Sequence, residues 1–156
     1  MVLLLKNALF TVVIPGTAAV YLPLVIARGR SITSCPPLLV TGFVLLSLGV
    51  AAYMWCVWDF ASFGRGTPLP IDAPRKLVVH GLYHYTRNPM YLSVLAVVVG
   101  WAALFGMAWL LAYASALALC CHLFVVFYEE LKLQDLFGLE YESYRRVVPR
   151  WFPRPR

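Results

Sequence analysis

Long stretches without charged residues alternate with short polar segments along the chain. Residues 8–27 and residues 38–58 contain no Lys, Arg, Asp or Glu. An α-helix rises about 1.5 Å per residue, so about 20 apolar residues cross the hydrocarbon core of a bilayer. Both segments are therefore predicted to be transmembrane helices. Pro15, Gly16 and Pro23 predict a kink in the first.

A third apolar segment is too long for a single crossing. Residues 90–128 also lack charged side chains, and as one helix they would extend about 60 Å, roughly twice the hydrocarbon thickness. The chain must fold back, and the turn is expected at Phe105-Gly106-Met107. The pattern thus predicts an all-α membrane protein with four transmembrane helices, of which the last two form a tight hairpin.

Polar segments separate and follow these helices. Residues 59–89 form a hydrophilic loop, whose glycines and prolines argue against a long helix. Residues 129–156 form an amphipathic helical tail with an apolar stripe at helical spacing: Leu133, Phe137, Tyr141, Tyr144 and Val148. Gly138 is expected to divide the tail into two short helices. Residues 1–156 are expected to form a single domain.

Composition and charge agree with a membrane protein. Of the 156 residues, 62% are hydrophobic and 13% are charged, and the net charge is +6. Basic residues flank the apolar segments, which is a topological role and argues against a nucleic-acid partner. Arg28 and Arg30 lie on one side, whereas the other eleven Lys and Arg lie on the side of the termini and the main loop. Both termini are therefore expected in the cytoplasm, with the first span retained rather than cleaved.

The cysteines and histidines predict neither a disulfide framework nor a metal site. Three of the four cysteines lie in apolar segments, and no CxxC motif occurs. His80 and His84 are four residues apart, which suits a metal only on a helix, and no third ligand is evident. His122 is expected to lie deep in the bilayer. We therefore expect no bound metal.

Two polar clusters lie at the expected cytoplasmic ends of the hairpin. The first is HGLYHYTRNPMY, residues 80–91, which includes Arg87. The second is Glu129 and Glu130, where a carboxylate near hydrocarbon is costly unless it is paired or hydrated. An interfacial belt or a solvated helix end would explain either cluster alone. Because both helix ends meet at one membrane face, Arg87 is the nearest expected partner of the glutamates.

These motifs resemble those of integral-membrane methyltransferases typified by isoprenylcysteine carboxyl methyltransferase and the related phospholipid methyltransferases. GLYHYTRNPMYLS is followed by YEELKLQDLFGLEYESYRRVVPRWFP. The family pattern is G-x-Y-x-x-x-R-[HN]-P-x-Y, then E-E, then F-G-x-x-Y-x-x-Y and a closing V-P-R. The match covers residues 66–153. Asn88 stands where the best-known members have histidine.

The resemblance implies S-adenosylmethionine as the methyl donor, bound at the cytoplasmic face between the hairpin and the tail. Arg87 suits the carboxylate of this donor, and Glu129 or Glu130 suits its amine and hydroxyl groups. The expected cofactor-binding residues are His80, Gly81, Leu82, Tyr83, Arg87, Asn88, Pro89, Tyr91, Glu129 and Glu130. The expected catalytic residues are Arg87, Glu130 and Tyr144.

Two functions are compatible with these residues. One is a membrane methyltransferase for a lipid-like or prenylated acceptor, in a bacterial inner membrane by resemblance, and the other is a non-catalytic module for binding or assembly. A scaffold has no need of Arg87 beside two glutamates, which favours the enzyme. An isoprenylcysteine carboxylate needs no base, whereas the amine of phosphatidylethanolamine must lose a proton. His84, Glu130 and Tyr144 are all conceivable bases, so the acceptor stays open.

Access to such a site is expected from two directions. The polar donor arrives from the cytoplasm, and the apolar stripe of the tail is expected to cover that entrance. A lipid acceptor arrives sideways from the bilayer. A lateral opening is expected between the spans, near the kinks at Pro15 or Pro23.

Overall fold

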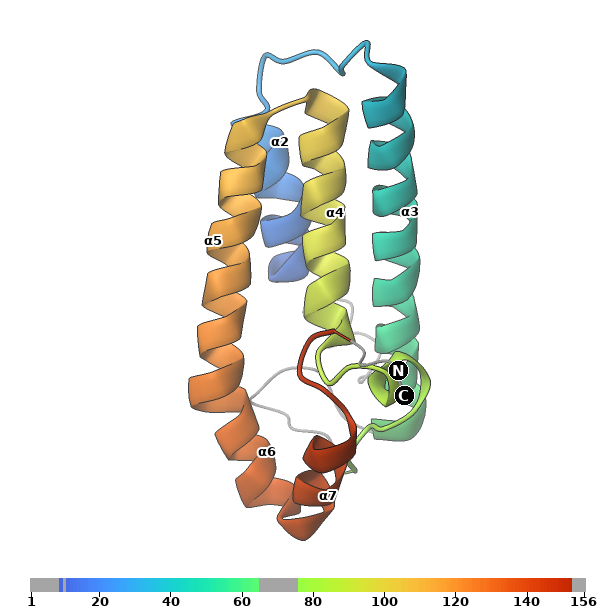
Figure 1. Ribbon diagram of the computed structural model, residues 1–156, viewed down its shortest axis with the longest axis vertical. Coiled ribbons are helices and arrows are strands. Elements are labelled where there is room, and N and C mark those ends of the chain that lie inside the picture. Colours follow the sequence, from blue (N-terminus) through green and yellow to red (C-terminus); the bar gives the residue numbers. More distant parts are fainter. Residues whose placement is uncertain (1–8, 10, 65–75, 153–156) are drawn as a thin grey trace.

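The computed structural model describes residue 9, residues 11–64 and residues 76–152, and all regular structure in this part is helical. Figure 1 shows long helices that run side by side, with two short helices at one end. The α-helices are α2 (Leu22–Ile26), α3 (Pro36–Asp59), α4 (Pro89–Phe105), α5 (Ala108–Phe124), α6 (Glu130–Phe137) and α7 (Leu139–Val147). The π-helical turns are η1 (Thr17–Tyr21), η2 (Phe60–Gly64) and η4 (Val125–Glu129), and η3 (Gly81–His84) is a 3-10 turn.

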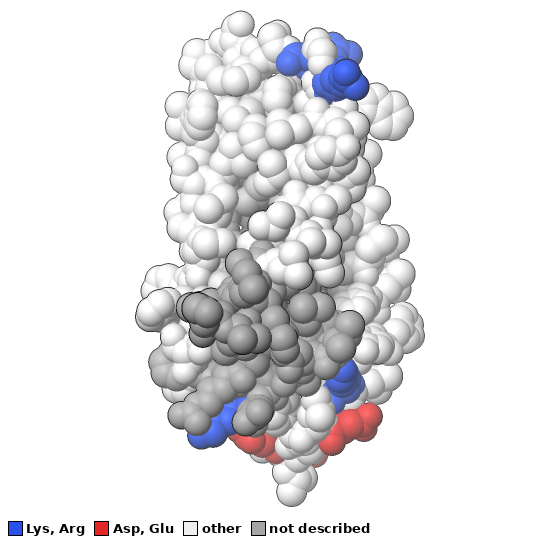
Figure 2. Space-filling model, turned by 180° about the vertical axis from the view of Figure 1, so that it is seen from behind, with Lys and Arg blue, Asp and Glu red and all other residues white. Residues whose placement is uncertain are grey.

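Two of the described helices are long and apolar enough to cross a membrane. They cover Pro36–Ser62 and Ala108–Phe137, whereas the apolar helices Thr11–Ile26 and Pro89–Phe105 are shorter. On the face drawn in Figure 2, the charged side chains of the described residues gather at the two ends of the long axis. The described part of the chain is therefore all-α, with two helices that are long and apolar enough to cross a membrane. Four complete crossings stay a prediction, because two of the helices are short for the hydrocarbon thickness.

A π-helical turn interrupts the first helix where the kink is expected. The turn η1 follows Pro15, whose missing backbone N–H disturbs the regular hydrogen-bond ladder. The carbonyl oxygens of Ala18 and Ala19 accept hydrogen bonds from Tyr113 and Trp101, at 2.7 and 3.0 Å. Side chains of α4 and α5 thus hold this irregular turn against the bundle.

The most extensive helix packing joins α3 to α4, rather than the two legs of the hairpin. Gly42 of α3 faces Gly100 of α4, and Gly49 of α3 faces Ser93 and Val97. A β-carbon on any of the three glycines would come within 3.0 Å of the opposite helix. Small residues let helix backbones approach closely in a membrane, where lipid supplies no hydrophobic drive for association. The glycines of the second span therefore let α3 pack closely against α4.

Two glycines divide the helices where the sequence predicts. Gly106 has φ 60° and ends α4, so the hairpin turns between Phe105 and Ala108. Gly138 has φ 51° and separates α6 from α7. Positive φ values favour glycine, which has no β-carbon to clash with the backbone. Ala108–Phe137 is a continuous helix, so the tail begins as an extension of the last span.

The chain after α7 turns back towards the hairpin. Trp151 Nε1 donates a hydrogen bond to His122 Nδ1 on α5 at 3.1 Å, and the Trp151 ring lies 6.5 Å from the Tyr91 ring on α4. Figure 1 shows this segment crossing the open end between α4 and α5. His122 is therefore a contact of the tail, rather than an isolated side chain within the bilayer.

Candidate active site at the end of the hairpin

The segment before α4 is packed firmly against the end of α3. Gly81 has φ 58°, and a β-carbon on it would collide with Asp59 Oδ2 and lie 2.9 Å from Trp55 Nε1. Tyr83 is buried in the apolar cluster at this end of α3. Pro89 occupies the first turn of α4, where its missing N–H costs nothing. These contacts place Arg87 at the mouth of the hairpin.

Glu130 is the centre of a buried ionic network. Its Oε1 accepts hydrogen bonds from Arg87 Nη1 at 2.9 Å and from Arg150 Nε at 2.7 Å, and its Oε2 accepts one from Arg150 Nη2 at 3.0 Å. The side chains of Arg87 and Glu130 are only 10% and 9% exposed. Charge-assisted bonds of this geometry offset the cost of removing the ions from water. The hydrogen bonds to Glu130 also raise the pKa of Arg150.

Two tyrosines of α7 hold the other side of this segment. Arg87 Nη1 also donates to the hydroxyl oxygen of Tyr141 at 3.1 Å, and the Tyr144 hydroxyl donates to the carbonyl oxygen of Tyr83 at 2.6 Å. Tyr141 is 1% exposed. Burial raises the pKa of both phenols, so both are neutral hydrogen-bonding groups at physiological pH. The stripe predicted on the tail therefore packs onto the residues around Arg87.

A seam of hydrogen bonds joins the backbone of the tail to the same segment. The Arg87 backbone N–H donates to the Pro149 carbonyl at 2.9 Å. The Thr86 hydroxyl and the Asn88 side-chain amide both donate to the Arg150 carbonyl, at 3.1 and 3.0 Å. Asn88 is buried. Its role in the seam is to donate a hydrogen bond, which does not require a titratable side chain. The V-P-R motif was the only sequence signal for this seam.

Glu129 and Glu130 have different partners. Glu129 Oε2 accepts a hydrogen bond from the Tyr91 hydroxyl at 2.8 Å, whereas Glu130 binds the two arginines. Successive residues on a helix point about 100° apart, so the two carboxylates cannot face one small pocket equally. Glu130 is the glutamate that holds Arg87 and the tail together.

Three buried polar atoms in the described part of the chain have no hydrogen-bond partner: Arg87 Nε, Asp59 Oδ2 and Gln134 Oε1. Buried polar groups are nearly always hydrogen-bonded, so such exceptions call for a reason. Arg87 Nε is a donor beside an already paired Glu130, which suits an anionic ligand. Among the described His, Cys, Asp and Glu residues, no group of three is arranged to hold a metal ion.

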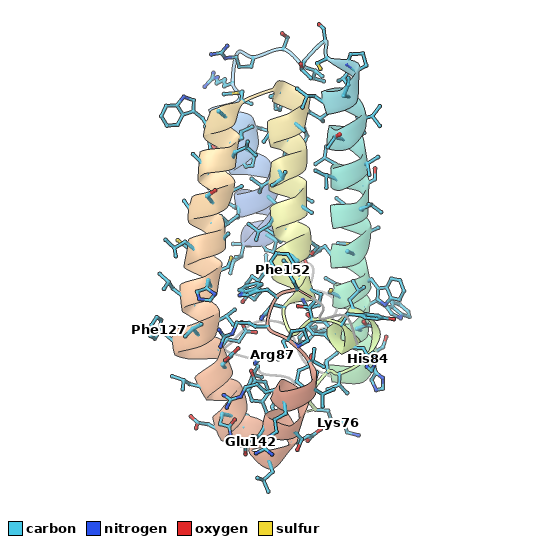
Figure 3. The ribbon with its side chains drawn as sticks, in the orientation of Figure 1. Lys76, His84, Arg87, Phe127, Glu142 and Phe152 are labelled. Atoms are coloured by element: carbon cyan, nitrogen blue, oxygen red, sulfur yellow. The ribbon has the colours of Figure 1, made fainter. Side chains whose placement is uncertain are left out.

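The structure brings most of the expected site residues together, but not the histidines. Figure 3 shows Arg87 in the space between α4, α5 and α7, whereas His84 lies on the outer side of η3. His80 and His84 are both exposed, and Leu82 packs into the cluster at the end of α3. Arg150, Tyr141 and Asp59 belong to this region although the sequence did not single them out as site residues.

A family model described as phospholipid methyltransferase matches residues 38–140. The match covers well over half of the chain, from the first turn of α3 to the start of α7. It includes Arg87, Glu129 and Glu130, and it ends before Tyr141 and Arg150. Among curated proteins and solved structures, none matches the chain.

Proposed function

Because the chain belongs to the phospholipid methyltransferase family, we propose that it transfers the methyl group of S-adenosylmethionine to a lipophilic acceptor at one face of a membrane. Family membership implies a methyl donor and a methyltransferase activity. The observation that carries the proposal is the buried network of Arg87, Glu130 and Arg150 at the end of the hairpin, with an unpartnered donor on Arg87 Nε.

The residues at the hairpin end fit the polar groups of S-adenosylmethionine. Arg87 Nε is a buried donor without a partner, and a guanidinium group suits a carboxylate. Glu129, held by Tyr91, would accept hydrogen bonds from an amine or a hydroxyl group. Aromatic and apolar walls would come from Tyr83 and Tyr91. Gly81, Leu82, Asn88 and Pro89 stay in the proposed binding set, whereas His80 is exposed and Glu130 is bound by two arginines.

The donor, when bound, supplies an electrophilic methyl group on a positively charged sulfur. The chain itself orients the two reactants and excludes water from them. The tail serves both purposes, because its side chains Tyr141 and Val148 are buried and its Trp151 donates a hydrogen bond to His122. Glu130 and Tyr144 form hydrogen bonds with other groups of the protein and do not face open space. We therefore assign them positioning roles, with Glu130 fixing Arg87 and Tyr144 fixing the Tyr83 backbone.

The acceptor that best suits these contacts is a lipophilic carboxylate of the isoprenylcysteine type. Both oxygens of Glu130 are occupied by arginine N–H groups. The Tyr144 hydroxyl donates to Tyr83, and burial raises its pKa. His84 lies on the exposed side of η3. None of these three groups is placed as a general base, and a carboxylate acceptor needs none because it is already nucleophilic at neutral pH.

A phospholipid amine is the second candidate acceptor, and the description of the matched family favours it. Such an amine must lose a proton before it attacks. Glu129 would then be the general base that accepts this proton, since its hydrogen-bond partner is the neutral Tyr91 hydroxyl rather than an arginine. For either acceptor we place the site at the cytoplasmic face, because most Lys and Arg residues lie on that side, and the resemblance favours a bacterial inner membrane.

Label transfer tests the proposed function and separates the two acceptors. Membranes that contain the protein are incubated with methyl-labelled S-adenosylmethionine, and the lipid extract is then treated with mild base. A methyl ester releases volatile label, whereas a methylated amine retains it. The proposal predicts label in the lipid extract above that of membranes with Arg87→Ala. Equal label in the two membranes would favour a non-catalytic module.

A further inference from the structure

Asp59 is a buried carboxylate that the proposed reaction does not yet use. Its side chain lies at the end of α3, the residue is 3% exposed, and its Oδ2 has no hydrogen-bond partner. A carboxylate oxygen removed from water without a hydrogen bond is costly, and the electrostatic interaction of Asp59 with His80 offsets only part of that cost. Packing alone therefore gives no reason for an aspartate here.

The position of Asp59 connects it to the candidate active site. Oδ2 lies against the Cα atom of Gly81, where any β-carbon would collide with it. Gly81 begins η3, and Tyr83 at the centre of this turn is held by Tyr144 from the tail. Six residues after Gly81 comes Arg87 with its unpartnered Nε. The segment from Gly81 to Arg87 therefore has an acceptor without a hydrogen-bond partner at one end, Asp59 Oδ2, and a donor without a partner at the other, Arg87 Nε.

We propose that Asp59 is a buried binding site for an ammonium group that enters with a substrate. An ammonium group is small, positively charged and carries three N–H donors, so it supplies the hydrogen bond that Oδ2 lacks together with a full positive charge. A divalent metal would need further ligands, and the described residues provide no such group of three. This inference rests on the proposed methyltransferase function, which offers two sources: the α-ammonium of the methyl donor or the head-group amine of a lipid.

The test compares Asp59→Asn with Asp135→Asn, which makes the same chemical change at an exposed position. Each purified variant is titrated with S-adenosylhomocysteine, and methyl transfer is measured against phosphatidylethanolamine in mixed micelles. Loss of one charged hydrogen bond should weaken the affected step about ten- to a hundredfold. The ligand-free Asp59→Asn protein should melt at or above the wild-type temperature, because the substitution removes a buried charge whose desolvation outweighs its interaction with His80.

The two arms identify the source of the ammonium group. A tenfold or larger rise in the S-adenosylhomocysteine dissociation constant of Asp59→Asn assigns Asp59 to the donor. An unchanged dissociation constant with a tenfold rise in the KM for phosphatidylethanolamine assigns it to the acceptor. If neither the dissociation constant nor the KM changes, Asp59 does not bind an ammonium group. The same conclusion follows if phosphatidylethanolamine is not a substrate and the dissociation constant is unchanged. Wild-type protein without donor binding or methyl transfer would instead overturn the proposed function itself.

A second measurement does not depend on how well Asp59→Asn folds. Wild-type protein is titrated with S-adenosylhomocysteine and with its analogue that lacks the α-amino group. If the donor supplies the ammonium group, the analogue should bind wild type at least tenfold more weakly, and Asp59→Asn should not distinguish the two ligands, because both changes remove the same contact. An equal preference for the amine in both proteins would exclude a contact between Asp59 and the donor.

Discussion

Arg87 Nη1 lies 2.9 Å from Glu130 Oε1, although 43 residues of chain separate the two. The left-handed turn at Gly106 makes this contact possible, because it returns α5 to the membrane face from which α4 starts. Arg150 then joins the pair from the tail. A hairpin, a helix end and the C-terminal segment thus meet at one buried carboxylate, and each of them can be tested separately.

The two glutamates should respond differently to the same substitution. Glu130→Gln leaves two guanidinium groups without their shared counter-charge, so we expect a loss of stability of about 3–5 kcal/mol. Glu129→Gln keeps the Tyr91 hydroxyl bonded to an amide oxygen, so we expect near wild-type melting and weaker donor binding. Melting temperature and donor affinity are measured for both variants. Equal changes in both quantities would contradict the division of roles.

Asn88 should act through its donor group alone. Its amide donates to the Arg150 carbonyl, and a histidine can place a ring N–H there. Asn88→Asp puts an acceptor beside a carbonyl oxygen and should destabilise the protein by about 1–3 kcal/mol. Asn88→His should be close to wild type in melting temperature and in donor affinity. The hydrogen-bond seam would lose its importance if the aspartate variant behaved like the histidine variant.

The tail should be a cover that the reaction requires. Truncation after Leu136 removes Tyr141, Tyr144 and Arg150 but spares Arg87 and both glutamates. We expect normal membrane insertion, much weaker donor binding and no methyl transfer. Arg150→Ala should reproduce part of the loss in binding, whereas Arg146→Ala is its control, because Arg146 is 76% exposed and pairs only with Glu142 on the surface. Full transfer activity in the truncated protein would reduce the tail to an interfacial anchor.

Alkaline pH should weaken the tail before the rest of the fold. Burial raises the pKa of Tyr141 and Tyr144 above the usual value of about 10. Above that pH the folded protein keeps protons that the unfolded chain has lost, so stability falls as pH rises. Stability below pH 10 should be independent of these groups. Tyr144→Phe should reduce the loss of folding stability with rising pH. An unchanged slope of stability against pH between pH 10 and 12 would exclude Tyr144 as a contributor to this loss.

Local sequence patterns predicted the helices and their breaks, because glycine at positive φ and uncharged runs of membrane length are local signals. The hairpin turn at Gly106 and the division at Gly138 lie where expected. The pairing of Arg87 with the glutamates also followed, since the turn fixes which helix ends meet. The sequence could not reveal which glutamate pairs with Arg87, because that depends on helix rotation at η4.

Contacts between distant segments carried no comparable signal. The packing of Gly42 against Gly100 and of Gly49 against Val97 needs two helices in register, and either helix alone looks like an ordinary span. The hydrogen bonds to the Pro149 and Arg150 carbonyls use backbone atoms that every residue has. Asp59 looked like a polar helix end, and only its burial shows otherwise.

Titration of the detergent-purified protein with S-adenosylhomocysteine, in wild type and in Arg87→Ala, tests most directly whether the hairpin end is a donor site. Wild type should bind. Arg87→Ala should stay monodisperse, because Arg150 still pairs with Glu130, and should lose about 2–5 kcal/mol of binding free energy. Absence of binding in wild type, or an equal dissociation constant in a folded Arg87→Ala protein, would contradict a donor site at Arg87.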